Sequence, residues 1–292
     1  MLIVVVVSFL NEERYLGVLL DSLAAQERLP DRLVLVDDGS TDGSSAMAEA
    51  FVARHAYARV LRRPERPPTR DRMVAAPELR SFLWAVERLE EPFDIVVKMD
   101  ADLRLTPRLV AEIEQRFVAD PRLGIAGTFL SAAMPDGTVV RERNPSYHAR
   151  APARFYRREC LEQVMPVPYM VGWETIDEVK ARMLGWRTRS FDVPGGDVVH
   201  LRPTGSHDGM LRGFRRDGDG AYRYGAHPVH VLLGGVNRLR DRPYVLGGVH
   251  YVAGWALAAA RRVPRAEPAI RAHARREQLL RMRALVSGRR AA

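Results

Sequence analysis

The sequence predicts an α/β fold, with a mostly parallel sheet flanked by helices and a helical extension at the C-terminal side. Apolar strand-like runs alternate with segments of helical periodicity, which is typical of parallel strands joined by right-handed crossovers. Charge is also divided unevenly: residues 1–200 carry 27 Lys and Arg against 30 Asp and Glu, whereas residues 201–292 carry 18 Arg against 6 acids. We therefore expect two domains, residues 1–205 and residues 206–292.

The predicted elements begin with a strand at residues 1–7. This run of Leu, Ile and Val is typical of a strand buried on both faces. It lacks the basic region and the small-residue cleavage site of a signal peptide. Further strands are expected at 33–36, 60–61 and 94–99, and helices at 15–26, 45–54 and 77–89.

Composition excludes several classes of protein. A content of 47% hydrophobic and 28% charged residues in 292 does not fit a disordered chain, a collagen or a coiled-coil rod. The single cysteine, Cys160, allows no internal disulfide and no zinc cluster of cysteines, so a reducing compartment is expected.

Polar residues end three of the predicted strands, at 8–12, 37–42 and 100–102. Ligands of open parallel sheets gather beyond the carboxyl ends of the strands, so these residues should converge on one crevice. Asp100 and Asp102 could jointly hold a hard divalent cation, Mg²⁺ or Mn²⁺, with a diphosphate supplying further oxygens. Asp37 and Asp38 could contact a ligand too, or Asp38 or Ser40 could cap the helix that follows.

Five motifs resemble, in order and approximate spacing, those of inverting family 2 glycosyltransferases of the GT-A fold, a Rossmann-like α/β fold, and in particular the type that builds bacterial cell-surface polysaccharide. They lie at residues 4–13, 36–42, 98–103, 172–178 and 185–188, so the resemblance covers about residues 2–205. It implies that residues 1–205 are a catalytic domain.

The resemblance also implies roles for single residues. Ser8, Asn11 and Glu12 would line the nucleotide pocket, and Asp37 or Asp38 would contact the base or ribose. Asp100 and Asp102 would hold the metal and the donor diphosphate, and His200 corresponds to a histidine that completes the metal shell in many GT-A enzymes.

An inverting transfer needs a base for the acceptor hydroxyl. The resemblance locates it in a segment with three acids, Glu174, Asp177 and Glu178, which share one face of a helix. Counting back from Gly185 favours Glu174, and Asp177, from the literal acidic pair, is the competitor. At least one of these acids could instead stabilise the N-terminus of the helix.

The last third of the chain has sequence features that predict binding to a membrane surface. Residues 207–228 predict a flexible or closely approached loop rich in Gly and Arg, and 244–260 is an apolar segment flanked by arginines. That segment fits an interfacial helix, or a re-entrant pair of short helices, better than a span, with an ordinary core helix as the alternative. Residues 267–290 predict a basic helix, which would be attracted to an anionic leaflet. Nucleic-acid binding is the competing interpretation of this basic helix, but the front domain lacks a recognition motif, so we expect no nucleic-acid partner.

We therefore expect a metal-dependent glycosyltransferase that moves a sugar from a UDP- or GDP-type donor to a hydroxyl of a lipid-linked or other glycan acceptor. It would work in the cytoplasm, as a peripheral protein on the inner face of the cell membrane. Two alternatives remain open: a nucleotidyltransferase that uses the same carboxylates, and a non-catalytic membrane or nucleic-acid adaptor. The donor sugar, the linkage and the oligomeric state are not predicted.

Overall fold

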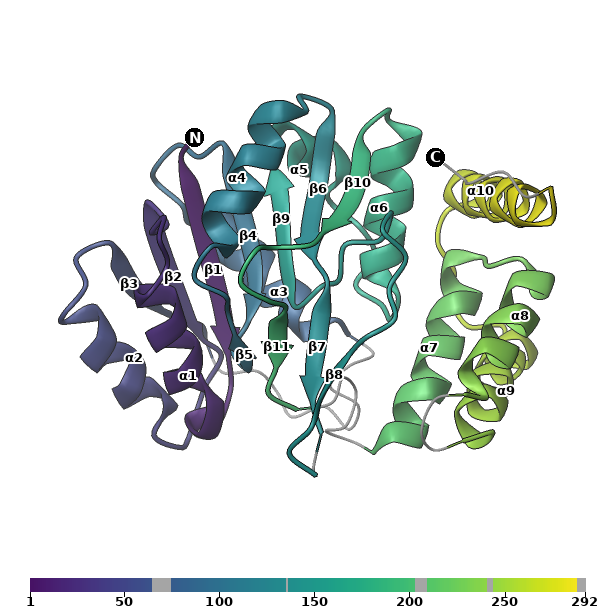
Figure 1. Ribbon diagram of the computed structural model, residues 1–292, viewed down its shortest axis with the longest axis horizontal. Coiled ribbons are helices and arrows are strands. Elements are labelled where there is room, and N and C mark those ends of the chain that lie inside the picture. The colour runs from purple at the N-terminus through teal and green to yellow at the C-terminus, as the bar shows by residue number, and fades with distance from the viewer. Residues whose placement is uncertain (65–74, 135, 203–208, 241–243, 288–292) are drawn as a thin grey trace. The chain divides into compact units, whose positions relative to one another are not determined.

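The structure is a computed structural model that describes residues 1–64, 75–134, 136–202, 209–240 and 244–287 (Figure 1). The described chain forms two compact units. The first comprises residues 1–64, 76–134, 136–165 and 184–202, and the second comprises residue 75 with 166–183, 209–240 and 244–287. Segment 166–183 thus groups with the C-terminal helices, whereas the predicted boundary was a single one near residue 205. The assignment of residues 1–205 to one catalytic domain stays a prediction.

The first unit is built on a seven-stranded sheet. β9 runs antiparallel to its neighbours β4 and β6, and every other strand pair in this sheet is parallel. The predicted α/β fold with a mostly parallel sheet is therefore confirmed. In sheet order the strands are β10 (Arg187–Phe191), β6 (Leu123–Thr128), β9 (Ala153–Arg157), β4 (Ile95–Asp100), β1 (Ile3–Phe9), β2 (Arg32–Asp37) and β3 (Ala58–Arg62).

Helices cover both faces of this sheet (Figure 1). On one face Val5 of β1 belongs to the same buried cluster as Leu16 of α1 and Ile113 of α4. On the other face Phe82 of α3 stacks on Tyr156 of β9, with ring centroids 5.8 Å apart. Because neighbouring residues of a strand point to opposite faces, both sets must be apolar, which explains the uninterrupted aliphatic run of β1. The helices of this unit are α1 (Glu13–Ala24), α2 (Ser44–Val52), α3 (Pro77–Val86), α4 (Leu109–Ala119) and α5 (Arg158–Val164).

A second, four-stranded sheet in the same unit follows the order β5-β11-β7-β8. Its strands are β5 (Leu103–Arg104), β11 (Val198–His200), β7 (Leu130–Ala133) and β8 (Val139–Arg141). The antiparallel pairing of β11 with β5 sets His200 opposite Leu103. It therefore brings a residue from late in the chain next to the end of β4.

The second unit is helical in its described part. Its helices are α6 (Trp173–Met183), α7 (Met210–Tyr224), α8 (Pro228–Arg238), α9 (Leu246–Ala260) and α10 (Pro268–Val286). α7 and α9 pack closely through glycine: a Cβ on Gly218 would lie 1.9 Å from the carbonyl oxygen of Tyr251, and one on Gly254 would lie 2.0 Å from that of Arg215. No larger residue fits at either position without moving the helices apart.

The loop predicted for residues 207–228 is wrong for most of its length. Residues 210–224 form α7, which ends where Gly225 adopts a left-handed conformation with φ of 85°. The glycines had indicated a loop because each costs about 1 kcal/mol relative to Ala inside a helix. Close packing against α9 offsets that cost. The prediction that another part of the backbone approaches these glycines closely is therefore confirmed. Residues 207–208 lie outside the described residues.

The two remaining C-terminal predictions correspond to helices. The apolar segment 244–260 contains α9, and the basic helix predicted at 267–290 corresponds to α10, with residues 288–290 outside the described part. Among the described helices, none combines the length and apolarity needed to cross a bilayer.

Candidate active site

The carboxyl ends of β1, β2 and β4 meet at one edge of the large sheet. The register pairs Ser8 with Asp100 and Phe9 with Asp37. The predicted convergence of the three polar segments is therefore found. It follows from parallel pairing, since adjacent parallel strands end at the same edge.

The loops after β1 and β2 are joined by side-chain hydrogen bonds. The Asn11 side-chain oxygen accepts from the backbone N–H of Thr41 at 2.8 Å, and the Ser40 hydroxyl accepts from the N–H of Asn11 at 3.2 Å. Asn11 has a φ of 57°, a left-handed conformation that Asn tolerates better than most residues. These contacts hold the two loops together at this edge of the sheet.

Asp37 and Asp38 have different surroundings. Asp37 accepts from the N–H of Ser40 at 2.8 Å and from the hydroxyl of Ser45, so it stabilises the turn into α2. Asp38 is buried, with Arg63 at 3.1 Å and the Ser81 hydroxyl at 2.8 Å. The expected cap of α2 by Asp38 or Ser40 is not found, because the N-cap residue is Gly43 and no side chain caps it.

Asp100 lies beside a buried cation. Lys98, whose side chain is 3% exposed, donates from Nζ to Asp100 and to the carbonyl oxygen of Ala151 at 3.2 Å. The ammonium group lies in an otherwise aliphatic strand and is compensated by these two contacts. The carboxylate of Asp100 is partly exposed, at 31%, and remains accessible at the sheet edge.

Asp102 is at the centre of an ionic network. Its Oδ2 lies 2.9 Å from His200 Nε2 and 2.5 Å from Arg202 Nε. Arg202 also donates to Glu12 Oε1 at 2.6 Å, so one guanidinium bridges two carboxylates from different strand ends.

The network shifts the pKa values of its members. Burial alone would raise the pKa of Asp102, but the hydrogen bond and charge of His200, together with the charge of Arg202, lower it below its ordinary value. Burial alone would lower the pKa of His200, but Asp102 raises it above its ordinary value. The two directions agree, because each group favours the charged form of the other.

Glu12 retains unsatisfied hydrogen-bonding capacity. Its Oε2 is buried and has no hydrogen-bond partner among the described residues. Burial raises the pKa of Glu12 above its ordinary value, although Arg202 acts in the opposite direction. A buried acceptor without a partner is costly, and a ligand at this point would supply the missing donor.

The predicted metal ligands are Asp100, Asp102 and His200. The structure joins Asp102 to His200 and leaves Asp100 beside Lys98. Within the described ranges, no group of three or more His, Cys, Asp or Glu side chains is arranged to hold a metal ion. Two carboxylates and one imidazole at one sheet edge still have the donor chemistry of a Mg²⁺ or Mn²⁺ site completed by substrate oxygens.

The candidate base residues lie on α6, in the second unit. Glu174, in the first turn of the helix, is partly exposed, whereas Asp177 and Glu178 are buried. Asp177 accepts from the backbone N–H of Glu178 at 2.6 Å, and Glu178 lies 3.6 Å from Arg182. Accessibility to an acceptor therefore distinguishes Glu174 from the other two acids.

Sequence reasoning missed two charged residues that contact the aspartates of this site, Lys98 and Arg202. The signal for Lys98 was present: a single Lys in an apolar strand, two residues before Asp100, must share a face with that aspartate. Arg202 had no comparable signal, because its contact with Glu12 joins residues 190 positions apart.

Comparison with known proteins decides the family. Residues 4–173, more than half of the chain, match the family described as "Glycosyl transferase family 2". The chain belongs to this family. It is therefore a glycosyltransferase, and two members of the network, Glu12 and Asp102, lie within the matched residues.

Relatives and solved structures agree with this assignment. The glycosyltransferase is 33% identical over 204 residues to an uncharacterized glycosyltransferase of Mycobacterium tuberculosis. The aligned region covers 66% of this chain and 85% of the relative. Its fold is similar to that of the mannosyltransferase PcManGT of Pyrobaculum calidifontis, solved with GDP-Man and Mn²⁺, with a TM-score of 0.56, 18% identity and coverage of 99% of this chain and 81% of that one. TarS of S. aureus, solved with UDP-GlcNAc, has a TM-score of 0.53 at 17% identity over 89% of this chain and 72% of that one.

Proposed function

We propose that this glycosyltransferase moves a sugar from a nucleoside diphosphate sugar to the hydroxyl of a lipid-linked glycan, with inversion and with the help of a divalent cation. The observation that carries the proposal is the network in which Asp102 contacts His200 and Arg202, at the sheet edge where Asp100 and Asp37 also end. It combines carboxylates for a cation with a guanidinium suited to phosphate oxygens.

Donor binding is assigned to the first unit. Asp100, Asp102 and His200 would hold Mg²⁺ or Mn²⁺, which when bound supplies Lewis-acid stabilisation of the departing nucleoside diphosphate. Ser8, Asn11 and Glu12 would line the nucleotide pocket, and the unpartnered Glu12 Oε2 suits a hydroxyl donor of the ligand.

The nucleotide base and ribose are assigned to the two aspartates after β2. Asp38 is buried against Arg63 and Ser81, and Asp37 faces the turn into α2. Either carboxylate could accept hydrogen bonds from the ribose hydroxyls or the base. Both UDP-type and GDP-type donors occur among proteins of similar fold, so both are candidates here.

Acceptor activation is assigned to Glu174. A general base must touch the hydroxyl whose proton it removes, and the partly exposed Glu174 meets this requirement better than the buried Asp177. The acceptor oxygen would form the new bond to the anomeric carbon as the bond to the diphosphate oxygen breaks, and the proton would pass to the Glu174 carboxylate.

The lipid-linked acceptor rests on the character of the second unit. This unit carries exposed apolar side chains on α8 and α9, and the chain from residue 201 onward holds 18 Arg against 6 acids. Both features suit a peripheral enzyme on the inner face of the membrane, working in cell-surface polysaccharide assembly.

The first test is calorimetric titration of UDP and GDP into the protein, with and without Mn²⁺. We expect one nucleotide to bind in a Mn²⁺-dependent manner, and we expect Asp102→Ala to abolish that binding. Asp192→Asn, at an exposed carboxylate paired with Arg141, is the matched control and should bind as the parent does. Failure of both nucleotides to bind to folded protein would overturn the assignment of the donor site.

The released product distinguishes transfer from nucleotidyl transfer. Incubation with a sugar nucleotide and an acceptor should release a nucleoside diphosphate. Release of pyrophosphate from a nucleoside triphosphate would instead identify a nucleotidyltransferase.

A further inference from the structure

The outer face of α8 is apolar and exposed. Val229, Leu232, Leu233 and Val236 recur at the spacing of one helical face, and their exposed fractions lie between 47% and 61%. Large apolar side chains exposed at every turn of a helix are unusual in a monomeric soluble protein, because such stripes normally face a core.

The apolar surface continues past the end of α8 into α9. Tyr244, Val245, Leu246 and Val249 are between 48% and 62% exposed. Neither α8 nor α9 contains an Asp, Glu or Lys, and Arg238, in the last turn of α8, is the single charged residue in the two helices apart from histidine. We call the eight residues of these two sets the α8–α9 apolar face.

The opposite sides of the two helices are already packed. A Cβ on Gly248 would lie 2.4 Å from the carbonyl oxygen of Gly235, and one on Gly235 would lie 2.7 Å from a methyl group of Val252. α9 in turn packs on α7 at Gly254. The two helices are therefore packed through their inner sides, whereas every residue of the α8–α9 apolar face is 47–62% exposed.

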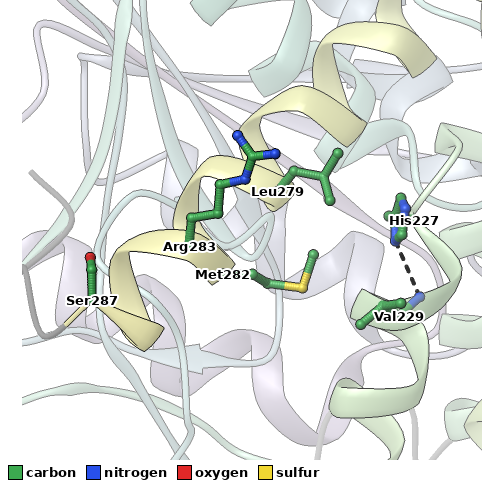
Figure 2. A pocket seen from close by; sticks show the side chains of 6 residues that line it. All are labelled: His227, Val229, Leu279, Met282, Arg283 and Ser287. Carbon is green, nitrogen blue, oxygen red and sulfur yellow. Dashed lines mark hydrogen bonds between the residues drawn. The ribbon is translucent and has the colours of Figure 1, made fainter.

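Cationic groups border this face. Arg240 follows α8, Arg261 and Arg262 follow α9, and all three are exposed. Arg283 of α10 lines a groove together with Val229, a member of the apolar face, and with Leu279 and Met282 (Figure 2). The groove has a volume of about 380 Å³ and is lined almost entirely by carbon, so it extends the apolar face toward the basic helix α10.

We propose that the α8–α9 apolar face docks onto an anionic lipid bilayer and inserts its side chains at the level of the headgroups. An apolar face bordered by exposed arginines complements a surface with acyl chains below a layer of negative charge. α9 has 15 residues and is about 22 Å long, less than the roughly 30 Å of a bilayer core, so the helices lie in the interface. This inference rests on the proposed function in one respect, because it names the surface that would bring the enzyme to a lipid-linked acceptor.

Insertion can be measured with a dye at a single cysteine. Cys160 is fully buried, so a cysteine introduced by Val236→Cys can be labelled selectively with an environment-sensitive fluorophore. With vesicles of phosphatidylcholine and phosphatidylglycerol we expect a blue shift and greater intensity. Val118→Cys is the matched control, since Val118 is equally exposed, at 66% against 61%, but lies on α4 of the first unit. Equal spectra with and without vesicles at Val236, or the same shift at Val118, would overturn the proposal.

Binding itself is tested by vesicle sedimentation of the double variant Leu232→Ser, Leu233→Ser. Both side chains are more than half exposed, so the variant should fold, which near-ultraviolet circular dichroism would check. We expect its partition onto the mixed vesicles to fall at least about tenfold. We also expect the parent's partition to fall when salt is raised or phosphatidylglycerol is left out. Unchanged partition of the variant would contradict the proposal.

Two further measurements distinguish membrane docking from dimerisation and from a defect in the donor site. If the parent is a dimer without vesicles and the double variant is a monomer, a second copy covers this face and membrane docking is overturned. Nucleotide titration of the double variant should equal that of the parent. Lost vesicle binding with intact nucleotide binding assigns the surface to docking, whereas lack of nucleotide binding in the parent would refute the donor site and leave the docking result standing.

Discussion

The two units of this glycosyltransferase use apolar and charged residues in opposite ways. In the first unit the aliphatic strands are buried on both faces, and charged side chains gather at the strand ends, where they are paired. In the second unit glycines form the closest helix contacts, while the α8–α9 apolar face and Arg240, Arg261 and Arg262 are exposed. The difference indicates that the first unit positions a polar site at the edge of its sheet, whereas the second unit presents an apolar and cationic surface.

The sharpest test of this division separates donor binding from acceptor activation. Glu174→Gln should lower kcat about 10²- to 10⁴-fold, because a neutral amide cannot accept the acceptor proton. Nucleotide affinity should stay unchanged, since the donor carboxylates belong to the first unit. Steady-state kinetics and calorimetric titration measure the two quantities.

Asp177→Asn is the companion variant. Asp177 is fully buried and accepts a hydrogen bond from Glu178, so its main effect should be on the stability of the second unit. If Glu174→Gln keeps its turnover while folded Asp177→Asn loses it, the base is Asp177 and our assignment is wrong.

A second, smaller effect should come from the glycine contact that holds α7 against α9. Gly254→Ala puts a Cβ only 2.0 Å from the carbonyl oxygen of Arg215. The clash should destabilise the protein by about 1–3 kcal/mol. Gly234→Ala is the matched control, because its Cβ would meet the edge of the Tyr251 ring at 3.2 Å and Ala favours the helix. Equal free energies of unfolding for the two variants, measured with denaturant, would contradict the close packing at Gly254.

The smallest expected effect lies in the first unit and depends on pH. Asp31 accepts from the N–H of Ile3 at 2.8 Å and from Arg28 at 2.7 Å. Burial raises the pKa of Asp31, but these hydrogen bonds and the charge of Arg28 lower it below its ordinary value. The carboxylate therefore stabilises the fold fully above the unfolded-state pKa, and this contribution is lost as the pH falls through the lower folded-state pKa.

Asp31→Asn should accordingly remove about 1 kcal/mol at neutral pH and flatten the loss of stability on acidification. Urea unfolding between pH 7 and the acid limit measures both. A variant whose stability falls with pH as steeply as that of the parent would show that Asp31 is not part of the acid response.

The sequence predicted the first unit better than the second. Aliphatic runs and the polar residues after them follow from local rules, so β1, β2, β4 and the convergence of Asp37 with Asp100 were predictable. The bridge from Asp102 to Arg202 was not, since β11 comes beside β5 only through tertiary pairing.

In the second unit, the low helix propensity of glycine led to a wrong prediction. The glycines of α7 indicated a loop, because the partner that favours them, the backbone of α9 at Tyr251, lies more than thirty residues further along the chain. The sequence alone also does not decide which acid is the candidate base. Glu174 and Asp177 differ by burial, which depends on how α6 packs and not on the motif that contains both.

The pairing of Arg182 on α6 with Glu277 on α10, at 2.8 and 3.0 Å, has a consequence for synthesis of the protein. The two residues are 95 positions apart, and a ribosome adds about 5–20 residues per second, so α6 waits about 5–20 s for its partner helix. The strands up to β4 are complete much earlier. The helix that carries Glu174 is thus among the last parts of the nascent chain to be stabilised, and a stalled chain would hold the donor carboxylates of Asp100 and Asp102 before α6 gains its contact with α10.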